Sequence, residues 1–328
     1  MYTALRQSFL TGLQLPLFMI SEFWRSWRVI HRYQIDIIHS HWFVPSGLVG
    51  AVIAFIEKKP HVLTSHVLDA NLFGKYRLFI PILSAIIASA DLITTNSRYT
   101  KQQIEVLVPL QCPCRVIPMG VCPLKNPPSE KSSYKHNILF VGRLVEWKGI
   151  DTLIRSMTVV RKAIPDSELN IVGEGLLREP LQRLVKDTGL TDTICFCGRL
   201  SDEDLAKHYD SASILVLPSR SFQGLVMEGL GVVLLEAMSH GVPVIGSNIG
   251  GIPDIIDDGR NGFLFQSEDE KNLAEKIIIL LSDTVLAERF RELGYDTVRT
   301  RFSWEDISRQ FSEAYELVLE GYNRKGKS

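Results

Sequence analysis

The regular alternation of short apolar runs with helical segments is the feature that most constrains the fold of this chain. In the first half the apolar runs are residues 35–39, 61–64, 92–95 and 115–117. After residue 137 the same pattern restarts, with runs at residues 138–141, 169–172, 194–196, 214–217 and 244–246. Short apolar runs that alternate with helical periodicity predict parallel strands covered by helices. We therefore expect an α/β protein with parallel sheets.

A polar segment divides this pattern into two parts. Residues 123–137 contain three prolines together with several serines and lysines, a composition typical of a linker between domains. The expected parts are an N-terminal Rossmann-like domain over residues 1–122, the linker, a C-terminal Rossmann-like domain over 138–303 and a last segment over 304–328. In that last segment apolar residues recur at every fourth position: Ile307, Phe311, Tyr315 and Leu319. This spacing predicts a helix with one apolar face, which we expect to pack back toward the N-terminal domain.

Composition argues against nucleic acid and against a zinc ion as partners of this chain. The chain has 328 residues, enough for two domains of ordinary size. Its net charge of −1 gives no electrostatic reason to expect a nucleic acid. The five cysteines include two pairs separated by a single residue, which is not the spacing of a zinc knuckle. We therefore predict no metal site, reduced thiols and a cytoplasmic location.

An apolar run near the N-terminus could pack in the core or contact a membrane. Residues 9–20 (FLTGLQLPLFMI) are interrupted by Pro16 and are too short to span a bilayer. They also lack the features of a signal peptide. We expect a core-packed or amphipathic helix. A helix that lies on the membrane surface, with Trp24 and Trp27 at the interface, is the alternative, and it would make the protein peripheral on the inner face of the membrane.

A glycine-rich loop in the second half is suited to bind a diphosphate. Gly229 and Gly231 lead into a helical segment, so that backbone N–H groups and the helix dipole converge on one point. Glu228 and Glu236 lie close to this anion site and must have another kind of partner. Carboxylates accept hydrogen bonds from pairs of neighbouring hydroxyls, which predicts a ribose on one side of the diphosphate and a hexose on the other. The alternative is that both glutamates are ordinary helix residues.

The segment VGRLVEWKGID supplies two cations next to a strand end. Arg143 follows the predicted strand directly, Lys148 lies in the loop, and Asp151 is placed to cap the next helix. The carboxyl edge of a parallel sheet is where open α/β folds bind ligands. Without a metal, such cations would neutralise the charge on a departing diphosphate. Ordinary surface charge is the alternative reading.

These segments together resemble glycosyltransferase family 4, which has the GT-B architecture of two facing Rossmann-like domains. The matching segments keep the order and spacing of the family: residues 141–151, 172–175, 196–205, 216–219, 228–238, 240–256 and 258–265. The two glutamates eight positions apart are part of the match. The combination is specific, although any one segment alone would be weak.

The resemblance implies roles for individual residues. Arg143 and Lys148 would bind the donor diphosphate. Glu228 would hold hydroxyls of the transferred sugar, and Glu236 would bind the ribose. The remaining donor contacts would come from the main chain, at Gly229, Leu230, Gly231 and Val232 for the sugar phosphate and at Arg199 and Leu200 for the base.

The resemblance also places catalytic residues in the first half. In PHVLTSHVLDA, His66 would lie near the donor sugar with Asp69 close by, while His39 and His41 would shape the acceptor side or pack. No metal or other cofactor is implied. The sequence Asp202-Glu-Asp204 has the form of a metal-binding motif, but it follows Ser201 as a capping box that opens a helix.

One part of the family pattern is missing. Family members open with a strand and a glycine-rich loop, whereas this chain starts with a helical pattern. We therefore expect a truncated N-terminal domain. The same sequence would also fit a non-catalytic subunit that binds a nucleotide sugar.

The resemblance predicts a retaining, metal-independent hexosyltransferase. It would move a sugar from a nucleotide diphosphate donor to an acceptor such as a glycan or lipid-linked glycan in polysaccharide biosynthesis. A sugar-nucleotide epimerase of similar fold is the nearest alternative. A dinucleotide-dependent dehydrogenase is disfavoured because G-x-G-x-x-G is absent after the first strand.

Overall fold

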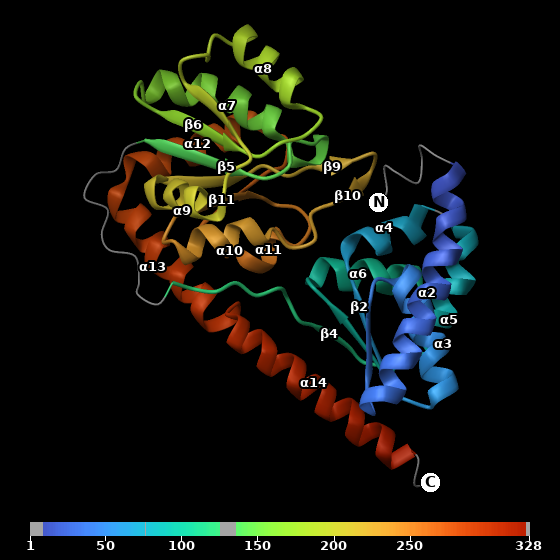
Figure 1. The fold of residues 1–328 in the computed structure, drawn as a ribbon. Helices are drawn as coiled ribbons and strands as arrows, with labels where there is room; N and C mark the ends of the chain where they lie inside the picture. The colour runs from blue at the N-terminus through green and yellow to red at the C-terminus, as the bar shows by residue number, and fades with distance from the viewer. Residues whose placement is uncertain (1–8, 76, 125–135, 326–328) are drawn as a thin grey trace. The chain divides into compact units, whose positions relative to one another are not determined.

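The computed structural model describes residues 9–75, 77–124 and 136–325 (Figure 1). Two compact units make up the chain: unit 1 is Met1–Ile117 with Ser308–Ser328, and unit 2 is Pro118–Ile307. Most of the segment expected to be a linker, residues 125–135, lies outside the described residues.

Unit 1 contains a four-stranded parallel sheet in the order β1-β2-β3-β4. Its strands are β1 (Ile38–His41), β2 (His61–Ser65), β3 (Leu92–Thr95) and β4 (Cys114–Val116). The connecting helices are α3 (Leu48–Glu57), α4 (Val67–Lys75), α5 (Ile80–Ala88) and α6 (Arg98–Leu107), with short helical turns η1 (Phe43–Gly47) and η2 (Arg77–Phe79). Every residue of β2 and β3 is buried, as expected for strands covered on both faces.

Two long helices contribute to unit 1, the second of them through its residues from Ser308 onward. Helix α2 (Phe9–Tyr33) contains Pro16 within its length and packs through Ile30 onto Val49 and Ile53 of α3. Helix α14 (Trp304–Lys325) lies within the expected segment 304–328 and extends beyond the apolar positions Ile307 to Leu319 that predicted it. Its Tyr322 hydroxyl donates to the carbonyl of Lys58, at the end of α3, over 2.6 Å.

Unit 2 contains a six-stranded parallel sheet in the order β12-β11-β8-β5-β6-β7. Its strands are β5 (Asn137–Val141), β6 (Glu168–Val172), β7 (Ile194–Gly198), β8 (Ile214–Leu217), β11 (Val244–Ser247) and β12 (Phe263–Phe265). The helices are α7 (Ile150–Ala163), α8 (Arg178–Asp187), α9 (Asp202–Ser211), α10 (Val232–Ser239), α11 (Ile252–Ile255), α12 (Glu270–Ser282) and α13 (Thr284–Arg301). A two-stranded hairpin, β9 (Ser221–Phe222) and β10 (Leu225–Val226), interrupts the loop before α10, and η3 (Glu146–Lys148) follows β5.

The helices of unit 2 cover both faces of the sheet. Helices α7 and α8 lie on one face, and α9 and α10 lie on the other (Figure 1). Helix α12 packs against α7, and α13 packs against α10. The predicted fold class, α/β with parallel sheets, is therefore confirmed. In the described part of the chain no helix is both long enough and apolar enough to cross a membrane.

Candidate functional site

The strand order of unit 2 marks a ligand site. After β5 the chain continues through β6 and β7 on one side, and β8, β11 and β12 lie on the other side. The carboxyl ends of β5 and β8 therefore border the point at which the order reverses, which is where open α/β sheets bind ligands. The loops that leave these two strands carry the predicted cations and Ser219.

Lys148 and Glu228 meet at this position. The Nζ of Lys148, in η3, donates to Oε2 of Glu228 over 2.7 Å. The hydroxyl of Ser219, directly after β8, donates to the same oxygen over 2.7 Å. Glu228 is only 9% exposed and Ser219 is fully buried. The carboxylate is thus neutralised and oriented by a cation and a hydroxyl from two neighbouring strand ends.

The glycine loop begins next to this ion pair. Gly231 has a φ of 91° and precedes the first turn of α10, which has no side-chain cap. The first N–H groups of a helix have no acceptor within the helix, and the helix dipole makes this end positive. The loop packs closely against Gly251, where a Cβ would lie 2.1 Å from the carbonyl oxygen of Gly229. Gly229, Leu230, Gly231 and Val232 thus form a closely packed turn beside the Lys148–Glu228 pair.

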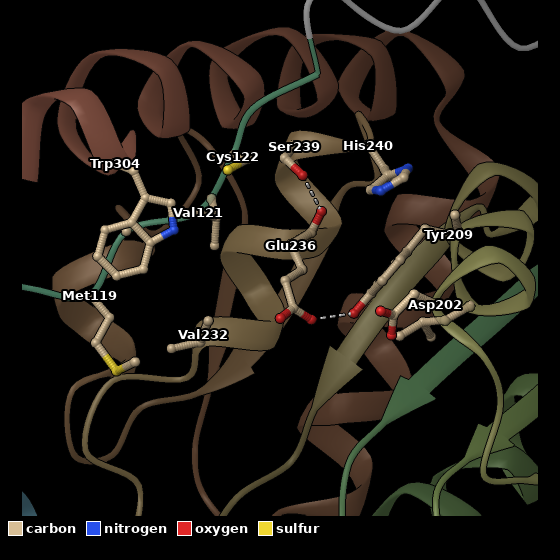
Figure 2. A pocket seen from close by; sticks show the side chains of 13 residues that line it. Met119, Val121, Cys122, Asp202, Tyr209, Val232, Glu236, Ser239, His240 and Trp304 are labelled. Atoms are coloured by element: carbon tan, nitrogen blue, oxygen red, sulfur yellow. Dashed lines mark hydrogen bonds between the residues drawn. The ribbon is translucent and has the colours of Figure 1, made fainter.

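Glu236 lies one turn further along α10 and borders a cavity of about 460 Å³. Figure 2 shows its carboxylate pointing toward Tyr209 of α9, and the Tyr209 hydroxyl donates to Oε2 over 2.8 Å. Burial, followed by the charge of Glu236, raises the pKa of Tyr209. Met119 and Trp304 lie on the opposite side of the cavity (Figure 2). The cavity therefore combines apolar walls with two carboxylates, those of Glu236 and Asp202.

The other predicted donor residues surround this region. The Arg143 guanidinium is exposed and lies 5.5 Å from the ring centre of Trp147. Arg199 is exposed and Leu200 is half-buried, directly after the end of β7. The structure therefore leaves Arg143 and Arg199 accessible to a ligand.

Two predictions about helix caps had different outcomes. The Ser201 hydroxyl accepts from the backbone N–H of Asp204, so the capping role is confirmed. Asp151 does not cap α7, because the helix begins at Ile150 after Gly149. Its carboxylate instead pairs with Arg220 over 3.0 Å.

Within the described residues no group of three or more His, Cys, Asp or Glu side chains is placed to hold a metal ion.

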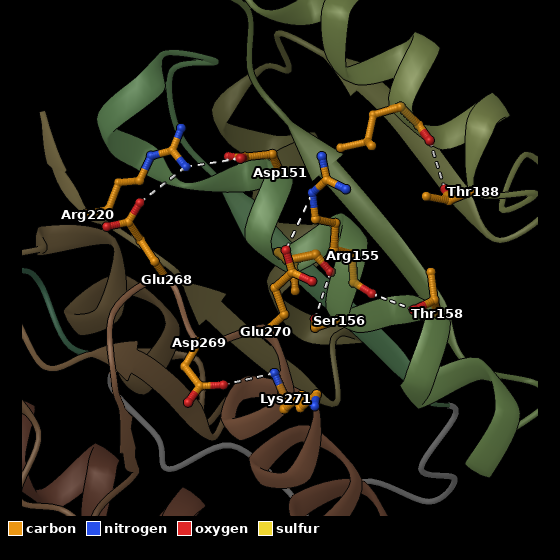
Figure 3. Close-up of polar contacts among 12 residues, drawn as sticks. Asp151, Arg155, Ser156, Thr158, Thr188, Arg220, Glu268, Asp269, Glu270 and Lys271 are labelled. Carbon is orange, nitrogen blue, oxygen red and sulfur yellow. Dashed lines mark hydrogen bonds and ion pairs between the residues drawn. The ribbon is translucent and has the colours of Figure 1, made fainter.

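Sequence reasoning gave no role to Arg220. Figure 3 shows its side chain between Asp151 and Glu268. Its backbone N–H also donates to the carbonyl of Trp147, and its Nε donates to the carbonyl of Glu146. Arg220 thus holds η3, and with it Lys148, against the loop that follows β8.

In unit 1, both carboxyl oxygens of Asp69 accept hydrogen bonds from other groups of the protein. Its Oδ1 accepts from the backbone N–H of His66 over 2.8 Å, and its Oδ2 accepts from Phe43 N–H and the Ser65 hydroxyl, each over 3.2 Å. Burial raises the pKa of Asp69 to about 7. The carboxyl group therefore orients the backbone that carries His66.

His66 follows β2 and lies in a group of stacked rings. Its Nε2 is 3.4 Å from Nδ1 of His41, and its ring centre is 5.3 Å from that of Trp42. The His39 and His41 rings stack with centres 4.6 Å apart. Burial lowers the pKa of His66 to about 4, with a smaller contribution from His41. Burial also lowers the pKa of His39 to about 4. These imidazoles are therefore neutral at physiological pH.

Two family models match adjoining parts of the chain. The model described as glycosyl transferases group 1 matches residues 125–297, and the model described as glycosyltransferase family 4 matches residues 2–123. An uncharacterized glycosyltransferase of Methanocaldococcus jannaschii is 33% identical over 88% of this chain and 77% of its own length. The GDP-mannose-dependent alpha-(1-6)-phosphatidylinositol monomannoside mannosyltransferase of Mycolicibacterium smegmatis is 27% identical over 92% of this chain and 81% of its own length.

Solved structures agree in fold. Anabaena HepE in complex with UDP has a TM-score of 0.76 at 21% identity and covers 90% of this chain and 81% of HepE. This likeness concerns the fold, which is of the GT-B type. The chain therefore belongs to the group 1 and family 4 glycosyltransferases and is a nucleotide-sugar-dependent enzyme of this family.

Proposed function

We propose that the protein is a retaining, metal-independent transferase that moves a hexose from a nucleoside diphosphate to a hydroxyl of a lipid-linked acceptor. The observation that carries this proposal is the buried cluster of Lys148, Glu228 and Ser219 beside the glycine loop. It combines a cation for a phosphate with a carboxylate for hydroxyls at the switch point of the sheet.

The nucleoside diphosphate of the donor would be held by unit 2. Lys148, Arg143 and the N–H groups of residues 229–232 would bind the diphosphate. Glu228, oriented by Lys148 and Ser219, would accept hydrogen bonds from hydroxyls of the hexose. In the cavity, Glu236 would exchange its Tyr209 contact for the ribose hydroxyls. Arg199 and Leu200 would contact the base through the main chain.

The chemistry would depend on stabilising the leaving group. As the bond between the sugar C1 and the phosphate oxygen breaks, negative charge grows on the diphosphate, and Lys148 and Arg143 would stabilise it. The acceptor oxygen would form its bond to C1 on the same face, and its proton would pass to the departing phosphate oxygen. His66 would position the sugar as a neutral hydrogen-bonding group, with Asp69 fixing its backbone.

The surface of unit 1 supports an acceptor at a membrane. Of the 22 exposed large hydrophobic side chains in the described part of the chain, six lie on α2 and three on α3. Arg25, Arg28 and Arg32 are exposed on the same helix α2. Apolar side chains, including Trp24, next to arginines suit the interface of an anionic bilayer. The mycobacterial relative is named for a phosphatidylinositol acceptor, so we propose peripheral membrane contact through α2 and a lipid-linked acceptor.

A donor screen tests this proposal. Thermal unfolding of the purified chain would be followed with GDP-, UDP- and ADP-hexoses, beginning with GDP-mannose, and one donor is expected to raise the Tm. That donor would then be incubated with and without a lipid extract. Glycolipid formed with retention and without added metal supports the proposal, whereas isomerised donor in the absence of acceptor would identify an epimerase. Lys148→Ala serves as the inactive control.

A further inference from the structure

Trp42 has a backbone conformation that side chains normally avoid. It directly follows β1 and has φ 72° and ψ 143°, close to a region of φ and ψ that is populated almost only by glycine. A Cβ in this conformation is strained, and an indole side chain forms no local hydrogen bond to the backbone that would compensate, as Asn or Asp can.

The surrounding backbone imposes this conformation. The Trp42 N–H donates to the carbonyl of Thr64 on β2 over 2.9 Å, and its carbonyl accepts from Gly47 N–H over 2.9 Å. Gly47 itself approaches closely, because a Cβ there would lie 2.5 Å from the Trp42 oxygen. Glycine would suit position 42 best on backbone grounds alone. The presence of tryptophan therefore points to a use for its side chain.

Packing in the hydrophobic core does not explain why tryptophan stands at position 42. The Trp42 side chain is 39% exposed, unlike Phe43, the next residue, which is fully buried. Its indole lies at the carboxyl edge of the unit 1 sheet, with its ring centre 5.3 Å from that of His66. His41 is exposed and completes the group, 3.4 Å from His66. A partly exposed indole thus lies beside neutral imidazoles at the edge of the sheet where open α/β folds bind ligands.

We propose that Trp42 is the platform on which the acceptor stacks a sugar or cyclitol ring. This inference rests on the proposed function, because it assigns the acceptor side of the same reaction. Polyhydroxylated six-membered rings have one face of C–H groups, which suits the negative face of an indole. The exposed His41 imidazole would hydrogen-bond a ring hydroxyl at the edge of the platform, and His66 would remain available to the transferred sugar.

The binding test uses two ring probes, methyl α-mannopyranoside and myo-inositol, in saturation-transfer NMR with the full chain. The wild type should bind at least one of them. Trp42→Gly and Trp42→Ala should weaken binding at least tenfold, and Trp42→Phe should restore most of it. Trp24→Ala, which removes an exposed tryptophan of α2, should bind as the wild type does. No binding by the wild type, or equal binding by Trp42→Gly, would overturn the inference.

Two further measurements distinguish a loss of ring stacking from other effects of the Trp42 substitutions. Trp42→Gly should melt several degrees above Trp42→Ala, since the two differ only in the strained Cβ; equal Tm values would contradict the strain on which the inference depends. Nucleotide binding by unit 2, measured by calorimetry with GDP and UDP, should be the same in wild type and Trp42→Gly. Loss of nucleotide binding only in the variant would contradict an acceptor role. Absence of nucleotide binding from the wild type would instead count against the proposed function.

Discussion

Lys148 and Glu228 are 80 positions apart in the chain, yet the ammonium group lies 2.7 Å from the carboxylate, and both side chains are largely buried. Burial makes each charge dependent on the other, because an unpaired charge in this environment would be poorly solvated. The pair therefore connects the stability of unit 2 with the geometry of its ligand site.

Removing the cation should harm both properties. In Lys148→Ala the carboxylate of Glu228 is left without its counter-ion, so we expect a lower Tm and a loss of transfer of about 10²- to 10³-fold. Adding Glu228→Gln should recover the Tm without recovering activity, because the buried charge is gone but the site is still incomplete. The measurements are thermal unfolding and steady-state transfer. Lys207→Ala, in an exposed ion pair of α9, is the control, and activity of Lys148→Ala within a few-fold of the wild type would contradict the assignment.

Glycine is required where the β5 and β6 loops touch. At Gly173 φ is 134°, and a Cβ would lie 1.9 Å from the carbonyl oxygen of Gly142. Gly173→Ala should therefore lower the stability by several kcal/mol, on the order of a large single-site effect. Gly189→Ala is the matched control, because Gly189 also has a positive φ, 69°, but a Cβ there would meet no heavy atom within 4 Å. Equal urea midpoints for the two variants would show that the contact is unimportant.

The buried histidines should make stability depend on pH. His39, His61 and His66 have pKa values lowered from 6.5 to about 4, mainly by burial. Between these values the unfolded chain binds protons that the folded protein excludes, so the free energy of unfolding should fall as pH falls from about 6.5 to about 4. Asp69 acts in the opposite direction, because its pKa is raised from 3.8 to about 7 and the folded protein retains its proton.

Variants separate these contributions. Urea unfolding at several pH values should give a shallower slope of stability against pH for His66→Gln. The slope for Asp69→Asn should be steeper than that of the wild type, since the opposing group is removed. Gln102→Ala, at an exposed and uncharged residue of α6, should leave the slope unchanged. Identical slopes for all four proteins would refute the buried, neutral state of His66.

The α2 surface should bind anionic vesicles. Co-sedimentation is expected with phosphatidylglycerol-containing vesicles and should weaken with added salt, because arginines contribute to the contact. Leu17→Ser with Trp24→Ser, at side chains 68% and 53% exposed, should reduce binding at least tenfold. Leu176→Ser with Val285→Ser removes two apolar side chains of unit 2 that are even more exposed, 87% and 80%, and should have no effect. Self-association of the wild type that is lost in the α2 variant would indicate that a second copy, not a membrane, covers this surface.

Local sequence signals predicted much of the fold. The apolar runs at 61–64 and 92–95 correspond to β2 and β3. The serine at position 201, predicted to open a helix, caps α9. Strand β1 lies at Ile38–His41, not at residues 35–39, because a continuous apolar run does not determine which residues pair. Strand β12, only three residues long, gave too short a signal to be predicted.

The candidate site shows the limit of such reasoning. Glu228 and Glu236 could be identified from their spacing and the neighbouring glycines. Their partners Ser219 and Tyr209 come from other strands and helices, so only the tertiary fold brings them together. The backbone conformation of Trp42 is likewise imposed by β2 and Gly47, and nothing in the local sequence indicates it.

The central claim is that unit 2 binds a nucleotide sugar between Lys148 and Glu236. The most direct test is calorimetric titration of nucleoside diphosphates into the full chain. One of GDP, UDP and ADP should bind the wild type. Glu236→Gln should weaken that binding about tenfold, because it removes the carboxylate that we propose as the acceptor for the ribose hydroxyls. Glu203→Gln, on the exposed surface of α9, should bind as the wild type does. Failure of all three nucleotides to bind, or unchanged affinity in both Glu236→Gln and Lys148→Ala, would contradict the account.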